Sequence, residues 1–119
     1  MSETPISLVE QDDNVVIVRT LVDSFDDDRV RLFHSEVRAA AEARGGRPFV
    51  LDLASINFLP SMSLAGLVRL ATEFRSRKQR LVVAGLQPQV REVFVVTRLD
   101  RVFELQDDVA AALRTIRPA

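Results

Sequence analysis

The sequence predicts one α/β domain over residues 1–119, with a mixed, mostly parallel sheet and the element order ββαβαβαβα. Short runs rich in β-branched residues alternate with longer stretches in which apolar residues recur at helical spacing. A polar turn separates the first two runs, so they form a hairpin and make the sheet mixed. The 119 residues are 47% hydrophobic and 28% charged, which is typical of one globular domain.

The first part of the chain predicts a hairpin followed by a helix. Residues 6–10 and 14–20 have the composition of strands, and the polar residues 12–14 suit a turn. The three aspartates at 26–28 open a helix, where negative charge is favourable at the positive end of the helix dipole. The glycine pair at 45–46 ends it. The apolar face of this helix consists of Val30, Phe33, Val37, Ala40 and Ala41.

The middle of the chain predicts a strand, a loop and a second helix. Residues 49–53 are almost continuously apolar, as in a buried strand. Residues 55–63 contain Ser, Asn and Pro between two periodic segments and form the loop. Arginine and lysine residues gather where the second helix ends, at the negative end of its dipole. The apolar face of this helix comprises Leu64, Leu67, Val68, Ala71 and Phe74.

Two further strand–helix pairs complete the predicted fold. Residues 81–85 form a short buried strand, and a helix runs from Pro88, a residue favoured in the first helical turn, to Thr97. Residues 102–105 form the last strand. Asp107 and Asp108 open a last helix, which turns Val109, Leu113 and Ile116 inward. The pattern does not decide whether the helices cover one face of the sheet or both.

Composition excludes most catalytic chemistries. The chain has no cysteine and only one histidine, His34, so thiolate chemistry and metal sites built on histidine clusters are absent. We therefore expect no metal and no cofactor, and we assign His34 a structural or surface role. We expect the aspartates at 26–28 to open a helix rather than bind a cation, because a cation loop needs spaced carboxylates and a glycine. The sequence offers no paired base and nucleophile, no metal cluster and no cofactor motif, so we do not expect an enzyme.

Charge and hydropathy bear on partners and location. The net charge is −1 and no aromatic residue interrupts the basic run at 75–80, so we interpret that run as a solvated helix end rather than a nucleic-acid site. No apolar stretch is long enough to span a membrane. Residues 1–5 lack the basic start and apolar run of a secretory signal. A cytoplasmic protein without membrane insertion is expected.

The loop before the second helix is the best candidate for a functional site. It follows the carboxyl end of a buried strand, where α/β sheets place ligands. Ser61 or Ser63 suits the N-cap of the following helix, because a hydroxyl there accepts from a free backbone N–H. The same hydroxyl is a natural target for phosphorylation, since a phosphate is favoured at a helix N-terminus.

The residues of this loop resemble a known family. The run Val50-Leu51-Asp52-Leu53-Ala54-Ser55-Ile56-Asn57-Phe58-Leu59-Pro60-Ser61-Met62-Ser63-Leu64-Ala65-Gly66-Leu67 resembles the signature of the STAS domain, the family that includes the bacterial anti-sigma factor antagonists. The later segment at 80–94 and the order ββαβαβαβα are also similar to that family. The resemblance places the phosphorylated serine of the family on Ser61. The acidic residue that precedes it in the family is replaced here by Pro60.

The resemblance implies a regulatory module of transcription that binds a protein, with two alternatives. In the first, the chain docks on a serine-kinase anti-sigma factor and phosphorylation of Ser61 releases it. In the second, the chain is a non-phosphorylated assembly module, a subunit of a signalling complex or of lipid-transport machinery; the replacement at Pro60 favours this alternative. The resemblance does not name the partner or the oligomeric state. The predicted partner-binding residues are Phe58, Leu59, Pro60, Ser61, Met62, Ser63, Leu64 and Leu67.

Overall fold

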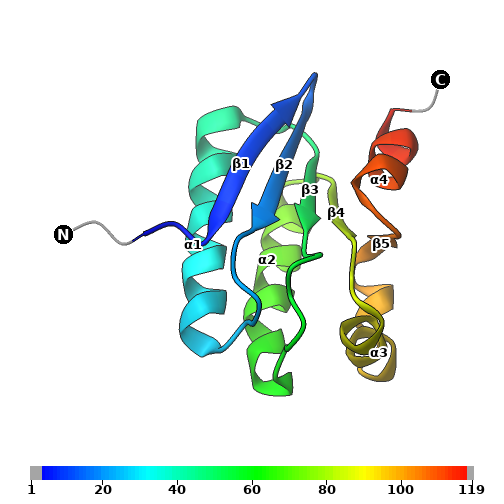
Figure 1. The fold of residues 1–119 in the computed structure, drawn as a ribbon. Helices are drawn as coiled ribbons and strands as arrows, with labels where there is room; N and C mark the ends of the chain where they lie inside the picture. The colour runs from blue at the N-terminus through cyan, green and yellow to red at the C-terminus, as the bar shows by residue number, and fades with distance from the viewer. Residues whose placement is uncertain (1–3, 118–119) are drawn as a thin grey trace.

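The five strands form one sheet in the order β1-β2-β3-β4-β5, in a computed structural model that describes residues 4–117. Strands β1 and β2 pair antiparallel, and every other neighbouring pair is parallel (Figure 1). Most of the segment used to judge a secretory signal lies outside the described residues. The elements are β1 (Ser7–Asp12), β2 (Val15–Thr20), α1 (Asp27–Arg44), β3 (Phe49–Asp52), η1 (Ser61–Ser63), α2 (Leu64–Ser76), β4 (Leu81–Ala84), α3 (Pro88–Val96), η2 (Leu99–Arg101), β5 (Glu104–Gln106) and α4 (Val109–Ile116).

The predicted class and element order are therefore confirmed. Most boundaries lie within one residue of the prediction, and two strand ends differ by two residues. Strand β1 extends to Asp12, because Asp13 adopts a left-handed φ of 55° that closes a tight turn with Asn14. Strand β5 begins at Glu104 rather than 102, because the amides of Val102 and Phe103 donate to Leu99 O in the preceding turn.

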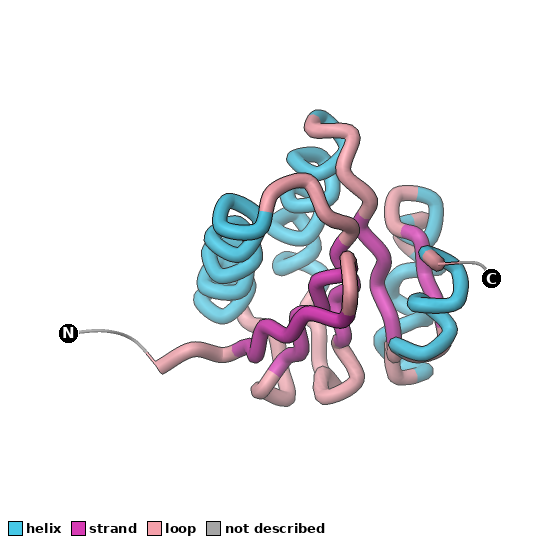
Figure 2. The backbone as a smooth tube through the Cα atoms, turned by 90° about the horizontal axis from the view of Figure 1, so that it is seen from above, coloured by secondary structure: helices cyan, strands magenta, loops and turns pink. Residues whose placement is uncertain are grey.

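Helices cover both faces of the sheet, which settles the question the sequence left open (Figure 2). The larger core lies between one face and α1, α2 and α3, and it includes the rings of Phe33, Phe74 and Phe94. The smaller core lies on the opposite face, where Ala112 of α4 is buried against β2, β3 and β4. The prediction that Val109, Leu113 and Ile116 turn inward is confirmed, although all three stay partly exposed.

Helix α1 begins as predicted. Asp26 is its N-cap, and its carboxylate accepts from Arg29 N at 2.9 Å. The helix ends before Gly45, which has a φ of 72° that few other residues adopt at low cost. None of the helices in residues 4–117 is long and apolar enough to cross a membrane.

Candidate functional site

The candidate loop lies at the carboxyl ends of the parallel strands. The connections that follow β2, β3 and β4 meet there, at the lower end of the sheet in Figure 1. Phe58 pairs with Ser24 in an isolated parallel bridge. Phe25 N donates to Phe58 O at 3.0 Å, and Asn57 N donates to Asp23 O at 2.8 Å. The loop after β3 is thus attached to the loop after β2 by backbone hydrogen bonds.

Polar side chains fix the first part of the loop to its neighbours. Ser55 Oγ donates to Val22 O at 2.7 Å and lies 2.5 Å from the hydroxyl of Thr20. On the other side, Gln87 Nε2 donates to Ala54 O at 2.8 Å. Because residues at the end of β2 and the N-cap residue of α3 both hold it, the loop presents its tip in a defined orientation.

Asp52, at the end of β3, supports the same turn. One carboxylate oxygen accepts from Ala54 N at 3.0 Å, and the other accepts from Arg19 Nη1 at 2.7 Å. A second carboxylate, Glu10, hydrogen-bonds to Arg19, and the two acids together raise the pKa of the guanidinium against the effect of its partial burial. Asp52 is thus engaged in structure rather than free for catalysis.

Ser61 stands at the start of the short 3-10 turn η1, with an exposed side chain. Pro60 ends the loop in an extended conformation, with φ −61° and ψ 142°. Within residues 4–117 the Ser61 hydroxyl forms no hydrogen bond, and the residue is exposed.

The predicted hydroxyl cap of the second helix is wrong. Ser63 occupies the position before α2, but its backbone is already helical, with φ −82° and ψ −10°. A capping side chain needs an extended backbone to reach the free N–H groups, and neither Ser61 nor Ser63 caps one. The Ser63 side chain is buried, with its hydroxyl 3.5 Å from Asp27 Oδ1.

The structure divides the predicted partner-binding residues into an exposed and a buried set. Phe58 is 60% exposed and Met62 is 80% exposed, and Ser61 is also exposed. Pro60 is half-buried. The buried residues of the set, which pack into or beside the larger core, are Leu59, Ser63, Leu64 and Leu67.

The predicted set of partner-binding residues therefore needs correction. Leu59 and Leu64 belong to that set, yet both are buried in the larger core and hold the loop and α2 on the sheet. Among the predicted partner-binding residues, Met62 and Phe58 are the large apolar side chains that stay exposed. The corrected tip consists of Phe58, Pro60, Ser61 and Met62.

An acidic wall stands beside this tip. The three aspartates at 26–28 and the side chains of Pro60 and Met62 line one hollow of about 420 Å³ between the start of α1 and the loop. From the sequence, these aspartates were expected only to open a helix. Their proximity follows from topology, because β2 and β3 are parallel neighbours and the segments after them leave the sheet at the same edge.

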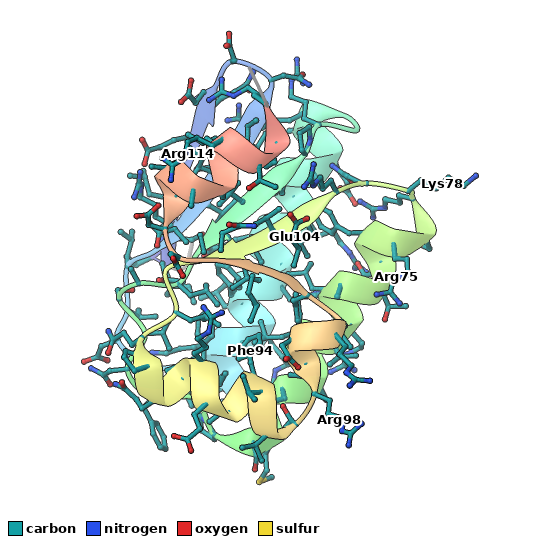
Figure 3. All side chains as sticks on the ribbon, turned by 90° about the vertical axis from the view of Figure 1, so that its right-hand side faces the viewer. Arg75, Lys78, Phe94, Arg98, Glu104 and Arg114 are labelled. Atoms are coloured by element: carbon teal, nitrogen blue, oxygen red, sulfur yellow. The ribbon has the colours of Figure 1, made fainter. Side chains whose placement is uncertain are left out.

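Other candidates lie away from the tip. His34 Nε2 is 2.9 Å from Glu73 Oε2, an ion pair or hydrogen bond that joins α1 to α2. Partial burial opposes ionisation of Glu73, but hydrogen bonds and charge from Arg38 and His34 outweigh it and lower the pKa of Glu73. Arg75 and Lys78 extend into solvent at the end of α2, as Figure 3 shows. Residues 4–117 contain no group of three or more metal-ligating side chains.

Known proteins share the fold of this chain. The model of the STAS domain family matches residues 7–112. The chain belongs to the STAS domain family. A relative from Bordetella bronchiseptica, BtrV, which is provisionally named an anti-sigma factor antagonist, is 32% identical over 83 residues, covering 67% of this chain and 72% of BtrV.

Solved STAS structures have the same fold. An anti-sigma factor antagonist from Mycobacterium paratuberculosis superimposes with a TM-score of 0.80 at 25% identity, covering 93% of this chain and 92% of that chain. SpoIIAA of Bacillus in its phosphorylated form superimposes with a TM-score of 0.68 at 16% identity, covering 93% and 99%. This STAS domain thus has the fold of anti-sigma factor antagonists.

Proposed function

We propose that this STAS domain is a cytoplasmic regulatory protein that docks through Phe58, Pro60, Ser61 and Met62 onto an anti-sigma factor with serine-kinase activity. The observation that supports this most directly is the exposure of the Ser61 hydroxyl between two exposed apolar side chains on a rigidly held loop. Relatives named as anti-sigma factor antagonists support the class of partner.

Phosphorylation supplies the switch in this proposal. Phe58 and Met62 enter apolar pockets of the partner and remove Ser61 from water when the complex forms. A phosphate on Ser61 would add a charge of about −1.5 to −2 at the centre of that contact. Burying an unpaired dianion is costly, and the aspartates at 26–28 beside the loop would add repulsion rather than compensation. The modified protein therefore dissociates.

A second candidate function is that of a permanent assembly module that is not phosphorylated. Pro60 favours it, because the family places an acidic residue there, and proline removes both that charge and a backbone N–H next to Ser61. In this role the same exposed tip binds a partner, but the association does not respond to phosphate.

Capture from the native cell followed by a kinase assay distinguishes the two. The tagged protein recovers its partner, and the complex is incubated with ATP and mapped for phosphate. The proposal predicts phosphate on exposed Ser61, none on buried Ser63, loss of the label in Ser61→Ala and its retention in Ser63→Ala. A partner whose binding is equal for wild type and Ser61→Asp, with no phosphate at Ser61, would establish the assembly module instead.

The role of the tip itself is tested with matched apolar substitutions. Met62→Ala should abolish capture, whereas Leu8→Ala, at another exposed apolar residue on β1, should leave it unchanged. Equal capture by both variants would refute docking through the tip.

A further inference from the structure

Strand β1 leaves one edge of the sheet unpaired within residues 4–117. It is the first strand in the order, and β2 pairs with it on one side only. Leu21 N donates to Ile6 O, so the even-numbered residues of β1 direct their backbone groups towards β2. Because these directions alternate along a strand, the N–H and C=O groups of Ser7, Val9 and Gln11 point away from β2. Ser7 is buried, whereas Val9 is half-buried and Gln11 is exposed, so the accessible part of this edge lies at Val9 and Gln11.

A shallow apolar groove accompanies this edge. It has a volume of about 390 Å³ and lies between β1 and α1, which run side by side in Figure 1. Its apolar lining comes from Pro5, Val9, Ala39, Ala40 and Ala43. An edge strand with free backbone groups and an apolar strip beside it is a template for another strand.

The charges at the two ends of this edge are opposite. At the beginning of β1, Glu36 of α1 accepts from the Ser7 hydroxyl and from Ile6 N. At the end of β1, Arg44 of α1 donates to Gln11 Oε1 at 2.9 Å. The edge therefore carries a carboxylate near Ser7 and a guanidinium near Gln11, with Val9 midway between them.

We propose that a second copy of this chain binds to this edge, so that two β1 strands pair antiparallel about a two-fold axis at Val9. In this register Val9 faces its own copy, and Ser7 of each chain faces Gln11 of the other. Glu36 of each chain then meets Arg44 of its partner. The two sheets become one continuous sheet, and the alanine strips of the two α1 helices approach each other.

The other registers are less favourable. Side chains opposite each other in an antiparallel pair share a face, so the axis must pass through a residue. An axis at Glu10 would place two glutamates directly opposite each other, and like charges there are destabilising. An axis at Leu8 would bring Pro5, which has no N–H, opposite Gln11. Of these three registers, the one centred on Val9 pairs both the outward backbone groups and the opposite charges.

The proposed contact is independent of the Ser61 tip. The β1 edge lies at the far side of β2 from β3, whereas the tip lies beyond the end of β3. A dimer therefore presents two tips, each free to bind a partner. If the dimer were disproved, the docking role of the tip would be unaffected.

Charge exchange tests the proposal. Sedimentation at neutral pH over micromolar to millimolar concentrations should show wild type passing from monomer to dimer. Glu36→Arg and Arg44→Glu should each weaken this dimer by about tenfold or more, because both symmetric contacts become repulsive. An equimolar mixture of the two variants should associate again, since every contact between them is attractive. Glu42→Arg, an exposed control on the same helix, should associate like wild type.

Fold integrity is checked by thermal unfolding of each variant. Glu36→Gln provides a milder variant, because its amide oxygen can accept from Ile6 N and its amide nitrogen can donate to Ser7 Oγ while the charge is removed; it should also weaken association. Amide exchange should show protection of Val9 N–H that increases with protein concentration. A protein that remains monomeric at every concentration, or a dimer that responds to neither charge reversal, would overturn the proposal.

Discussion

Gly66 allows α1 and α2 to approach closely beneath the candidate site, and its replacement by alanine gives a sharp test of this packing. A Cβ at position 66 would lie 2.4 Å from Val30 Cγ1, whereas carbon atoms in contact are normally about 3.5–4.0 Å apart. The helices would have to separate by about 1 Å, because the β-branched Val30 has essentially one rotamer in a helix.

The expected magnitude is a balance of two terms. Alanine gains about 1 kcal/mol over glycine in a helix interior. Overpacking a tight core contact costs about 1–3 kcal/mol. We therefore expect Gly66→Ala to lower the free energy of unfolding by about 1 kcal/mol. Val30→Ala alone should cost about 2 kcal/mol through lost burial, and it should remove the clash.

Urea unfolding of the two single variants and the double variant measures the coupling. The double variant should be less destabilised than the two single changes added together, by about 1–2 kcal/mol. Gly46→Ala is the control, because nothing lies within 4 Å of a Cβ there; it should change stability by less than about 1 kcal/mol. A Gly66→Ala protein that is more stable than wild type, or additive effects of positions 30 and 66, would refute the close-packing argument.

Three other changes have definite expected outcomes. Glu73→Gln should lower the free energy of unfolding by about 0.5–1 kcal/mol at neutral pH. Because folding lowers the pKa of Glu73, the difference between wild type and variant in urea unfolding should decrease once the pH falls below the ordinary pKa of 4.5 and vanish below the lowered pKa. Gly85→Ala should lower the melting temperature, because Gly85 has a φ of 79° and a Cβ there would lie 3.2 Å from Asp52 Oδ1; an unchanged melting temperature would contradict this. Asp108 is the N-cap of α4, and its carboxylate accepts from Ala111 N at 2.7 Å. Asp108→Ala should lower the free energy of unfolding, measured by chemical denaturation, by about 1 kcal/mol, whereas Asp107→Ala, at a residue that does not cap the helix, serves as the control.

The sequence was sufficient for the class of fold because local signals and topology agree. The aspartates at 26 and 108 open α1 and α4 as N-caps, and buried β-branched runs form the parallel strands. The boundaries that differed depend on turns: Asp13 in a left-handed conformation and the hydrogen bonds to Leu99 O are tertiary details that periodicity does not encode.

The position of the candidate loop at the end of β3 was predicted from the sequence, but the side chains that it exposes were not. The sequence does not distinguish a buried leucine from an exposed one in a loop. The structure shows that Leu59 and Leu64 are both buried and pack the loop against the core. The acidic wall at 26–28 was equally hidden, because its neighbours Pro60 and Met62 are more than thirty residues away in sequence. Parallel pairing of β2 and β3 is the signal that could have revealed it.

Calorimetric titration of the captured partner with variants of the loop tests the central proposal most directly. Phe58→Ala and Met62→Ala should each weaken binding by about thirtyfold or more, as expected for exposed apolar anchors that become buried, and Ser61→Asp should abolish it. Leu8→Ala should bind like wild type. Wild-type affinity in Phe58→Ala, Met62→Ala and Ser61→Asp alike would contradict docking through this loop.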